Sequence, residues 1–413
     1  MPDIAFKRRE MEHLLNAVAT SLQRGGAYLV SQCAPNGPIM RERNLSYVHK
    51  ATWGMYAAGV DHRLVARLLD WAYTEALQPN GDFFFPDEPP EYRDSQRVYR
   101  ALTFGKVAAW LDHPLARDQR VINRLLQYQH ASGGVFAYIG DDPQHPTPAP
   151  TIGTLNTSFF GHMMLALGRE REAVRAGDWL VRFVQANARH MADEGMMYTT
   201  MTPEGQLITD VPPGQRIAGV LDNRQPKQEF WQVGTTMAYL ASLYDTLRDC
   251  WQRSAMDAAP YLEAALALLD FEMTMPLETY LWPSKCKVGW GAGELLRVLV
   301  KYQLGDERTC EMAYQVARKV AIHTFMDNQL PHGGWSCMHY PLNELIPEMA
   351  FEYKPLQGLV NVPDQRIPGS QTIFLPSVEI SGEFLGEMKA IEVGVRAWWE
   401  ALAHGQSDTK EAL

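Results

Sequence analysis

A pair of helical stretches followed by a glycine- and aromatic-rich segment recurs along this chain, and this repeat constrains the fold more than any other feature. In one copy, an apolar helical stretch covers residues 44–58 and a second covers 62–78. The segment Pro79–Asn80–Gly81 ends the second stretch, and three phenylalanines follow at 83–85. Glycine after the last periodic residue ends a helix because it adopts the left-handed conformation without strain. Each copy is therefore expected to be a helical hairpin that ends in a closing turn.

The closing turns are spaced at intervals typical of stacked helical repeats. A closing segment without glycine covers residues 277–282. The other closing turns contain Gly37, Gly81, Gly134, Gly195 and Gly333, of which the first four are separated by 44, 53 and 61 residues. Repeats of about 20–50 residues are units that bury their apolar faces only against neighbouring copies. The repeat therefore predicts one domain over residues 1–413, with a disordered tail at about 405–413.

About twelve helices are expected, in two sets of six. The predicted outer helices, each with one apolar and one charged face, are 6–32, 62–78, 116–130, 170–188, 256–274 and 307–327. The predicted inner helices, rich in glycine, alanine and aromatic residues, are 44–58, 95–111, 154–167, 229–247, 287–304 and 377–401. A helix that is apolar nearly all round is a buried one. Alternating buried and amphipathic helices favour an all-α (α/α)6 toroid with one central pocket; an open solenoid is the alternative.

Charge and cysteine content indicate which partners and which cellular compartment to expect. The formal net charge is −10, and the basic residues are scattered, so nucleic acid is not an expected partner. The five cysteines are widely spaced without a CxxC pair, which favours a reducing, cytoplasmic setting over a disulfide framework. Charges in Met1–Arg9 do not fit a signal peptide, and no apolar run reaches about 18 residues, so no membrane span is expected.

Three long loops interrupt the repeat. They cover residues 139–151, which are proline-rich, residues 204–228, and residues 343–376 before the last helix. Long loops in a compact domain are often lids over a functional site, and surface linkers are the alternative interpretation.

Three closing segments carry a more specific likeness. They are residues 78–85 (QPNGDFFF), 129–138 (QHASGGVFAY) and 328–337 (NQLPHGGWSC). These segments resemble the glutamine, glycine and aromatic turns that tie adjacent hairpins together in triterpene cyclases. In architecture the whole chain looks like the α/α-toroid superfamily, which includes squalene and hopene cyclases, protein prenyltransferase β subunits and, on a related (α/α)6 plan, many sugar-active enzymes. The resemblance implies the toroid fold.

The acidic and metal-binding motifs of these relatives are not reproduced. No DxDD motif is present, and residues 141–145 (DDPQH) end in histidine where DDxxD requires aspartate. Prolines there also disfavour a helical aspartate face. Cys337 and His339, with Asp327 and His332 upstream, are possible zinc ligands, but zinc requires four tetrahedral ligands, and a core thiol beside a loop histidine is the favoured interpretation. We therefore predict no metal and no cofactor.

The candidate site residues lie where the closing turns and the first turns of the inner helices meet, since both gather at one mouth of a toroid. Helix N-termini there also present unpaired N–H groups. The candidate catalytic residues are His49, Glu229, Lys287, Glu379 and Glu383. The candidate substrate-binding residues, mostly aromatic or amide-bearing, are Tyr47, Phe84, Tyr99, Arg100, Phe136, Asn156, Trp231, Trp282, Lys285, Trp290 and Trp335. Together they describe an apolar cup with a few polar groups, as is usual for small-molecule sites.

Two groups of residues point most directly to chemistry. Residues 285–291 (KCKVGWG) place two lysines before a glycine-rich inner helix. A buried lysine can act as a base or bind a carboxylate; an ion pair with Glu229, Glu379 or Glu383 is the alternative. Glu379 and Glu383 share one helix face through their i, i+4 spacing. They are candidates for acid–base work or partners of Lys287 and Arg100, and a solvated face is the alternative.

These features favour a cofactor-independent cyclase or isomerase that acts on an apolar terpenoid or polyketide intermediate by proton transfer or by a shape-controlled, Diels–Alder type cyclisation. A sugar-active (α/α)6 enzyme, either a glycoside hydrolase, a lyase or an epimerase, is the alternative, since 11 tryptophans and 17 tyrosines suit sugar stacking. A non-enzymatic binding scaffold is a third hypothesis. The expected partner is a small-molecule substrate.

Overall fold

The computed structural model describes residues 4–34, 45–88, 90–136, 152–211, 219–226, 228–336, 362–363, 371–372 and 376–408. Twelve α-helices lie within these ranges. The predicted loops 139–151 and 343–376 lie wholly or largely outside them, as do Cys337 and His339. No helix in the described part of the chain combines the length and the apolar character that a membrane crossing requires.

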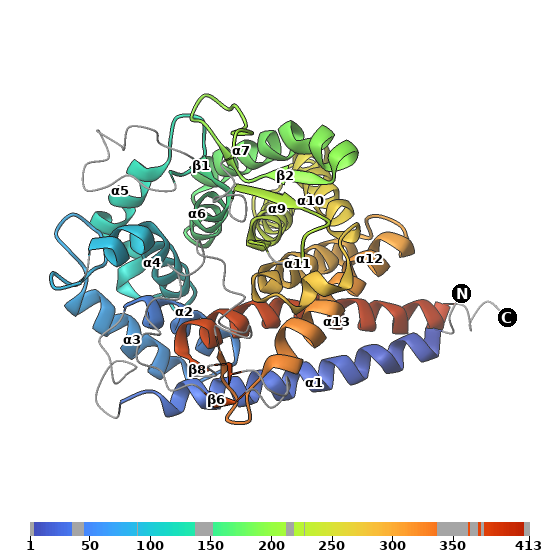
Figure 1. Cartoon of the computed structure of the whole chain (residues 1–413), viewed down its shortest axis with the longest axis horizontal. Coiled ribbons are helices and arrows are strands. Elements are labelled where there is room, and N and C mark those ends of the chain that lie inside the picture. The colour runs from blue at the N-terminus through green and yellow to red at the C-terminus, as the bar shows by residue number, and fades with distance from the viewer. Residues whose placement is uncertain are drawn as a thin grey trace.

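Six inner helices form a closed ring. They are α2 (Leu45–Ala57), α4 (Pro90–Trp110), α6 (Thr154–Ala166), α9 (Trp231–Asp249), α11 (Cys286–Tyr302) and α13 (Val378–Asp408). Each contacts the next one along the chain, and α13 returns to pack against α2 (Figure 1). The ring is therefore closed rather than an open solenoid, and the predicted (α/α)6 toroid is confirmed.

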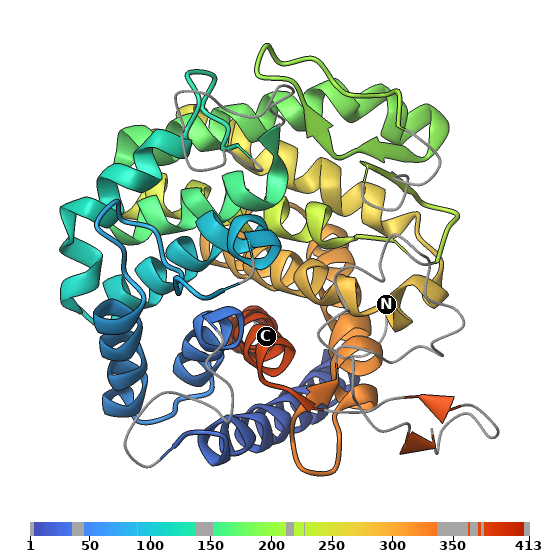
Figure 2. The ribbon, with the colours of Figure 1, turned by 60° about the vertical axis from the view of Figure 1, so that its left-hand side comes forward.

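The outer helices cover the ring from outside. They are α1 (Ile4–Ser31), α3 (His62–Glu75), α5 (Gln119–Tyr128), α7 (Glu170–Arg189), α10 (Ala255–Met273) and α12 (Glu307–Lys319). Five of them pack against the inner helix that precedes them in the chain. The exception is α1, which packs against α13, so the first and last helices form the sixth hairpin (Figures 1 and 2).

Side-chain caps and wide turns explain where several outer helices differ from their predicted bounds. Asp61, Asp118, Ser254 and Asp306 accept hydrogen bonds from backbone N–H groups of the first turns of α3, α5, α10 and α12. The Asp118 cap starts α5 at Gln119, after a separate 3₁₀ turn at Pro114–Arg117, so the single helix predicted at 116–130 is shorter. Beyond α12 the chain continues in a π-helical turn, Val320–Phe325.

Two of the closing turns tie their hairpin to a neighbouring outer helix through a glutamine side chain. The side-chain amide of Gln129 donates to the carbonyl oxygens of Gly133 (2.9 Å) and of Glu172 on α7 (3.0 Å). Gln329 repeats this pattern with Gly333 (2.8 Å) and with Ser21 on α1 (2.9 Å). Gly133 has a φ of +100°, and an added Cβ would collide with the backbone of Arg175 on α7. These glutamine–glycine turns therefore tie adjacent hairpins together, like the turns that they resemble.

Short antiparallel strand pairs shape the connections that lead into the inner helices. β1 (Ile152–Gly153) pairs with β3 (Thr200–Met201), and β2 (Met196–Tyr198) pairs with β4 (Val220–Asp222) in the register Met196 to Asp222. β5 (Trp335–Ser336) pairs with β8 (Pro376–Ser377), directly before α13. β6 (Val362–Pro363) and β7 (Gln371–Thr372) pair at the edge of the molecule, apart from the ring (Figure 2).

Glycines let the inner helices approach one another closely. An added Cβ at Gly234 of α9 would collide with the backbone of Lys287 on α11, and one at Gly54 of α2 would collide with the backbone of Gly382 on α13. Gly293 of α11 meets the backbone of Ala390 on α13 in the same way. The glycine content of the inner helices thus serves helix packing, which brings side chains from neighbouring helices together at the ring centre.

Candidate functional site

A buried charge cluster joins three inner helices near their amino-terminal ends. The Lys50 Nζ of α2 lies 2.8 Å from Glu379 Oε1 and 2.6 Å from Glu383 Oε2, both on α13. Lys287 of α11 forms an ion pair with Glu383, and its Nζ lies 3.4 Å from Glu387 Oε1. We refer to Lys50, Lys287, Glu379, Glu383 and Glu387 as the charge cluster. Ion pairs this deeply buried stabilise little unless every charge is matched.

Burial and neighbouring charges shift the pKa values of the groups in and beside the cluster. Glu387 is fully buried, and this burial raises the pKa of its carboxyl although Lys287 and Lys50 oppose the change. Burial likewise raises the pKa of the neighbouring Cys286 thiol, to which the charge of Glu387 also contributes. For Lys50, burial lowers the pKa, but the carboxylate of Glu379 outweighs this and the net pKa is raised. Burial therefore favours the un-ionised forms of Glu387 and Cys286, whereas the carboxylate of Glu379 favours the charged form of Lys50.

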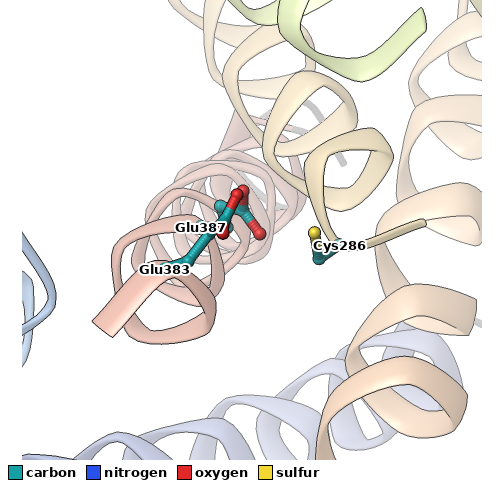
Figure 3. A group of neighbouring side chains, drawn as sticks. All are labelled: Cys286, Glu383 and Glu387. Atoms are coloured by element: carbon teal, nitrogen blue, oxygen red, sulfur yellow. The ribbon is translucent and has the colours of Figure 1, made fainter. Parts of the chain in front are cut away.

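Cys286, Glu383 and Glu387 form the one group among the described residues with the composition of a metal site. Their ligand atoms lie within 4.8 Å of one another, with the two glutamates extending from α13 and Cys286 facing them from α11 (Figure 3). A metal ion would require the thiol and carboxyls to be deprotonated. Here burial favours the protonated forms, and two lysines already neutralise Glu383. The group is better suited to holding a proton than a metal.

An aromatic layer lies next to the charge cluster across the ring centre. It consists of Trp53, Tyr99, Phe159 and Trp290, from four inner helices, which meet edge to face with ring centroids between 4.7 and 6.0 Å apart. The Tyr99 ring also lies 5.3 Å from Lys50 Nζ, which connects the layer to the cluster. Edge-to-face packing presents the negative faces of some rings to their surroundings, and such faces attract cations.

A cavity of about 460 Å³ lies on the other side of this layer, between the carboxyl-terminal halves of α2, α4, α6 and α9 and the central turns of α11 and α13. Trp53, Trp290, Lys106 and His162 belong to its lining. The remaining lining residues are Tyr56, Ala57, Trp110, Leu165, Ala166, Ser242, Asp245, Thr246, Glu294, Arg297, Gly386, Lys389, Ala390 and Val393. This volume is within the range that small-molecule sites occupy.

Two basic groups of the cavity have pKa values that burial lowers. Lys106 is 2% exposed, and burial lowers its pKa to about 7, against the opposing effect of Glu387 and Glu294. His162 stacks on Trp290 with the ring centroids 4.7 Å apart, and burial and the nearby Lys106 hold its pKa well below the usual value. Near pH 7, Lys106 is therefore partly un-ionised and His162 is neutral, so both can present a nitrogen lone pair to the cavity.

Several predicted site residues are brought together. Lys287, Glu379 and Glu383 belong to the charge cluster. Glu379 pairs with Lys50, and Glu383 pairs with both Lys50 and Lys287. An ion pair with Lys287 was one interpretation of these glutamates from the sequence. Tyr99 and Trp290 belong to the aromatic layer, and Trp290 also lines the cavity. The predicted mouth and the cavity do not coincide, because the cavity lies towards the carboxyl ends of α2, α4, α6 and α9.

Two predicted cationic residues lie apart from the charge cluster. Lys285 is fully buried in an ion pair with Glu272 of α10, and its Nζ lies 3.9 Å from the centre of the Phe230 ring. Arg100 pairs with Glu88 through its Nη1, at 2.8 Å from Oε2, and not with the glutamates of α13. Both residues therefore form ion pairs with glutamates outside the charge cluster.

The remaining predicted residues hold positions around the ring. His49 is fully buried beside the Tyr99 ring, and neither of its ring nitrogens has a hydrogen-bond partner among the described residues. Trp335 is buried and donates to the carbonyl oxygen of Phe325 (2.8 Å), and Asn156 donates to that of Phe136 (3.3 Å). Trp282 is also buried, whereas Tyr47, Phe84, Glu229 and Trp231 are half-buried near the starts of inner helices or in closing turns.

Glu387 and Lys106 were missed by the sequence analysis, although both left a signal. Glu387 lies four residues after Glu383, so it continues the same helix face. Lys106 is the single charged residue in the otherwise apolar stretch from Ala101 to Trp110. A lone cation in a buried helix marks a position where the side chain reaches a polar or open space.

Comparison with known proteins finds similarity in fold and not in sequence. No family model matches the sequence, and no curated protein matches it. Among solved structures, a D-mannose isomerase aligns over 91% of this chain and 96% of its own, with 10% identity and a TM-score of 0.54.

Two further structures align over 92% of this chain and 99% of their own with a TM-score of 0.50. They are the type II terpene cyclase MstE from Scytonema, with 14% identity, and an α-1,6-mannanase from Salegentibacter, with 13% identity. At these identities the likeness establishes the fold. The chain is an (α/α)6 toroid, and the three similar proteins are all enzymes.

Proposed function

We propose that this protein is a cofactor-independent cyclase or isomerase that moves a proton on a small, largely apolar and unsaturated substrate of the terpenoid or polyketide kind. The observation that carries the proposal is Glu387, a fully buried carboxylic acid whose pKa is raised by burial at the centre of the ring. An acid that keeps its proton at neutral pH can act as a general acid.

The surroundings of Glu387 support both halves of such a reaction. Transfer of its proton to a double bond would create a cation in the substrate, which the faces of Trp53, Phe159 and Trp290 can stabilise. The glutamate anion left behind would be stabilised by Lys287, 3.4 Å away. Return of a proton from the rearranged cation to Glu387 or to the neutral His162 ends the cycle, so the product is an isomer of the substrate.

Deuterium incorporation tests this proposal. In D₂O, the protein is expected to convert farnesol or geranylgeraniol into an isomer that contains one deuterium from solvent, detected by mass spectrometry. Glu387→Gln should reduce the rate by about 10²-fold or more, as is typical for loss of a general acid. Glu400→Gln, an exposed position on the same helix, serves as the matched control. An unchanged rate in Glu387→Gln would contradict the assignment.

The rim of the cavity is the observation that favours a sugar-active enzyme as a second candidate. Asp245 and Glu294 line the cavity beside Trp110 and Trp290, a combination that suits hydroxylated ligands. Both acids, however, bind the same arginine: Arg297 Nη1 lies 2.8 Å from Asp245 and its Nε lies 3.1 Å from Glu294. Burial raises the pKa of Asp245, but Lys301 and Arg297 lower it further than that. Asp245 is therefore poorly suited to be the protonated acid that glycoside hydrolysis requires.

A binding experiment separates the two candidates. Trp53, Trp110 and Trp290 all line the cavity, so its occupation should change tryptophan fluorescence. Saturable changes with farnesol and none with D-mannose or D-glucose are expected. Saturation by the sugars alone would favour the second candidate.

A further inference from the structure

Among the residues that the structure describes, Lys106 is a buried lysine without a carboxylate partner. Lys50 and Lys287 pair with the glutamates of α13, and Lys285 pairs with Glu272. In the part of the chain that the structure describes, no carboxylate lies within 4.0 Å of Lys106 Nζ. Lys389, which lines the same cavity, forms an ion pair with Glu392 at 2.7 Å.

Aromatic rings surround the Lys106 amine at the floor of the cavity. Its Nζ lies 3.8 Å from the ring centroid of Trp53 and 5.2 Å from those of Trp110, Phe159 and Trp290. The side chain is 2% exposed, yet it belongs to the cavity lining, so a ligand in the cavity can reach the amine while bulk water cannot surround it. Such a position combines a nucleophile with an apolar wall.

We propose that Lys106 is a covalent binding site for aldehydes and ketones, which it captures as an imine. The lone pair of Nζ forms a bond to the carbonyl carbon and gives a carbinolamine. The carbon–oxygen bond then breaks, the two amine hydrogens leave with the oxygen as water, and a carbon–nitrogen double bond remains. The step requires no oxidant or reductant, and it does not rest on Glu387 acting as an acid.

The charge environment keeps the amine available for this reaction. Burial lowers the pKa of Lys106 to about 7, and Lys287 of α11 adds to this effect, whereas Glu387 of α13 and Glu294 of α11 oppose it. His162 of α6 is a neutral base beside it. A lysine with an ordinary pKa of about 10.4 is almost entirely protonated at pH 7, so the free-amine fraction of Lys106 is about a thousandfold larger.

Reductive trapping of the whole protein tests the proposal. The protein is incubated at pH 7 with benzaldehyde and sodium cyanoborohydride, which reduces an imine to a stable benzylamine, and is then mapped by peptide mass spectrometry. We expect Lys106 to be benzylated at least tenfold faster than Lys389 and the other lysines. Formaldehyde, as a second and smaller probe, should also label Lys106 first.

Two matched variants control this experiment. Lys319→Arg, on α12 and outside the cavity lining, should leave the Lys106 adduct unchanged. Lys106→Arg, which keeps the charge but cannot form an imine, should abolish the adduct without creating a new site. The map of the unmodified sequence decides the matter even if Lys106→Arg does not fold. Labelling of Lys106 no faster than of Lys389 by either probe, or labelling at the N-terminal amine alone, would overturn the proposal.

Discussion

At the scale of single residues, the centre of the ring is distinguished by where its protons are held. Glu387 and Cys286 have raised pKa values, while Lys106 and His162 have lowered ones, and burial is the main cause in all four cases. Carboxyl and thiol groups shifted towards their protonated forms thus lie on one side of the aromatic layer, and amine and imidazole groups shifted towards their neutral forms lie on the other, a pattern that is common at sites of proton transfer.

The lowered pKa of Lys106 predicts a pH-dependent stability difference. Below pH 7 the lysine is charged in both the folded and unfolded states, so the folded state bears the full cost of burying the charge. Between pH 7 and 10.5 only the unfolded state remains protonated, and the stability of the protein should rise with pH.

Lys106→Met removes the charge and keeps the length of the side chain. The variant should be more stable than the parent by up to about 4 kcal/mol at pH 7 and below. Denaturant unfolding at pH 6, 8 and 10 should show this difference shrinking as pH rises. A difference that is constant across this range would contradict the buried, shifted amine.

Side-chain direction at the ring centre was only partly predictable. The adjacency of Lys287 to Glu383 followed from the repeat, since both lie near the starts of neighbouring inner helices. Lys285 precedes Lys287 by two residues, which is about 200° around a helix axis. One lysine therefore faces α10 and the other the ring centre, and sequence spacing alone does not tell which is which.

At the scale of helices, the ring depends on inner surfaces that lack side chains. Gly54, Gly234 and Gly293 place helix backbones against each other, which explains why glycine is common where a helix would ordinarily avoid it. The order and bounds of most helices were predictable, because each hairpin carries its own stop signal. The separate 3₁₀ turn at Pro114–Arg117 was not predictable, because it depends on Asp118 capping α5 at Gln119.

Gly234→Ala tests this close packing. The added methyl group would meet the backbone of Lys287, which cannot move aside as a flexible side chain can, so the free energy of unfolding should fall by about 1–3 kcal/mol or more. Gly153→Ala is the matched control, because Gly153 has an extended conformation and nothing lies within 4 Å of an added Cβ there. Equal unfolding midpoints for the two variants would speak against glycine-mediated packing.

At the scale of the whole molecule, the two ends of the chain complete the ring. α1 and α13 lie side by side, with Lys7 Nζ 3.9 Å from the Trp398 ring and Arg8 4.6 Å from the Trp399 ring (Figure 1). Trp335 is buried at the same junction, where its backbone N–H donates to Ser381 Oγ (2.9 Å) and its ring packs against Phe384 of α13. The closed ring was predictable from the repeat, but the position of the cavity relative to the charge cluster depends on how side chains fill the centre.

Trp335→Ala should weaken the molecule at this junction. Loss of a large, fully buried aromatic side chain is expected to lower the free energy of unfolding by about 3–5 kcal/mol. Because every inner helix contacts two others, the ring should still unfold in one transition, with circular dichroism and tryptophan fluorescence giving the same midpoint. Two separate transitions, with the terminal helices melting first, would show that the ring does not unfold as a unit.

Our central proposal is that Glu387 keeps its proton inside the folded ring, and infrared difference spectroscopy tests it most directly. At pH 7, the spectrum of the protein minus that of Glu387→Gln should contain the carbonyl stretch of an un-ionised carboxylic acid, with the small downshift that D₂O causes. The corresponding difference for Glu400→Gln, an exposed position on the same helix, is the matched control and should lack this stretch. A carboxylate signal from Glu387 at pH 7 would contradict its assignment as the proton donor.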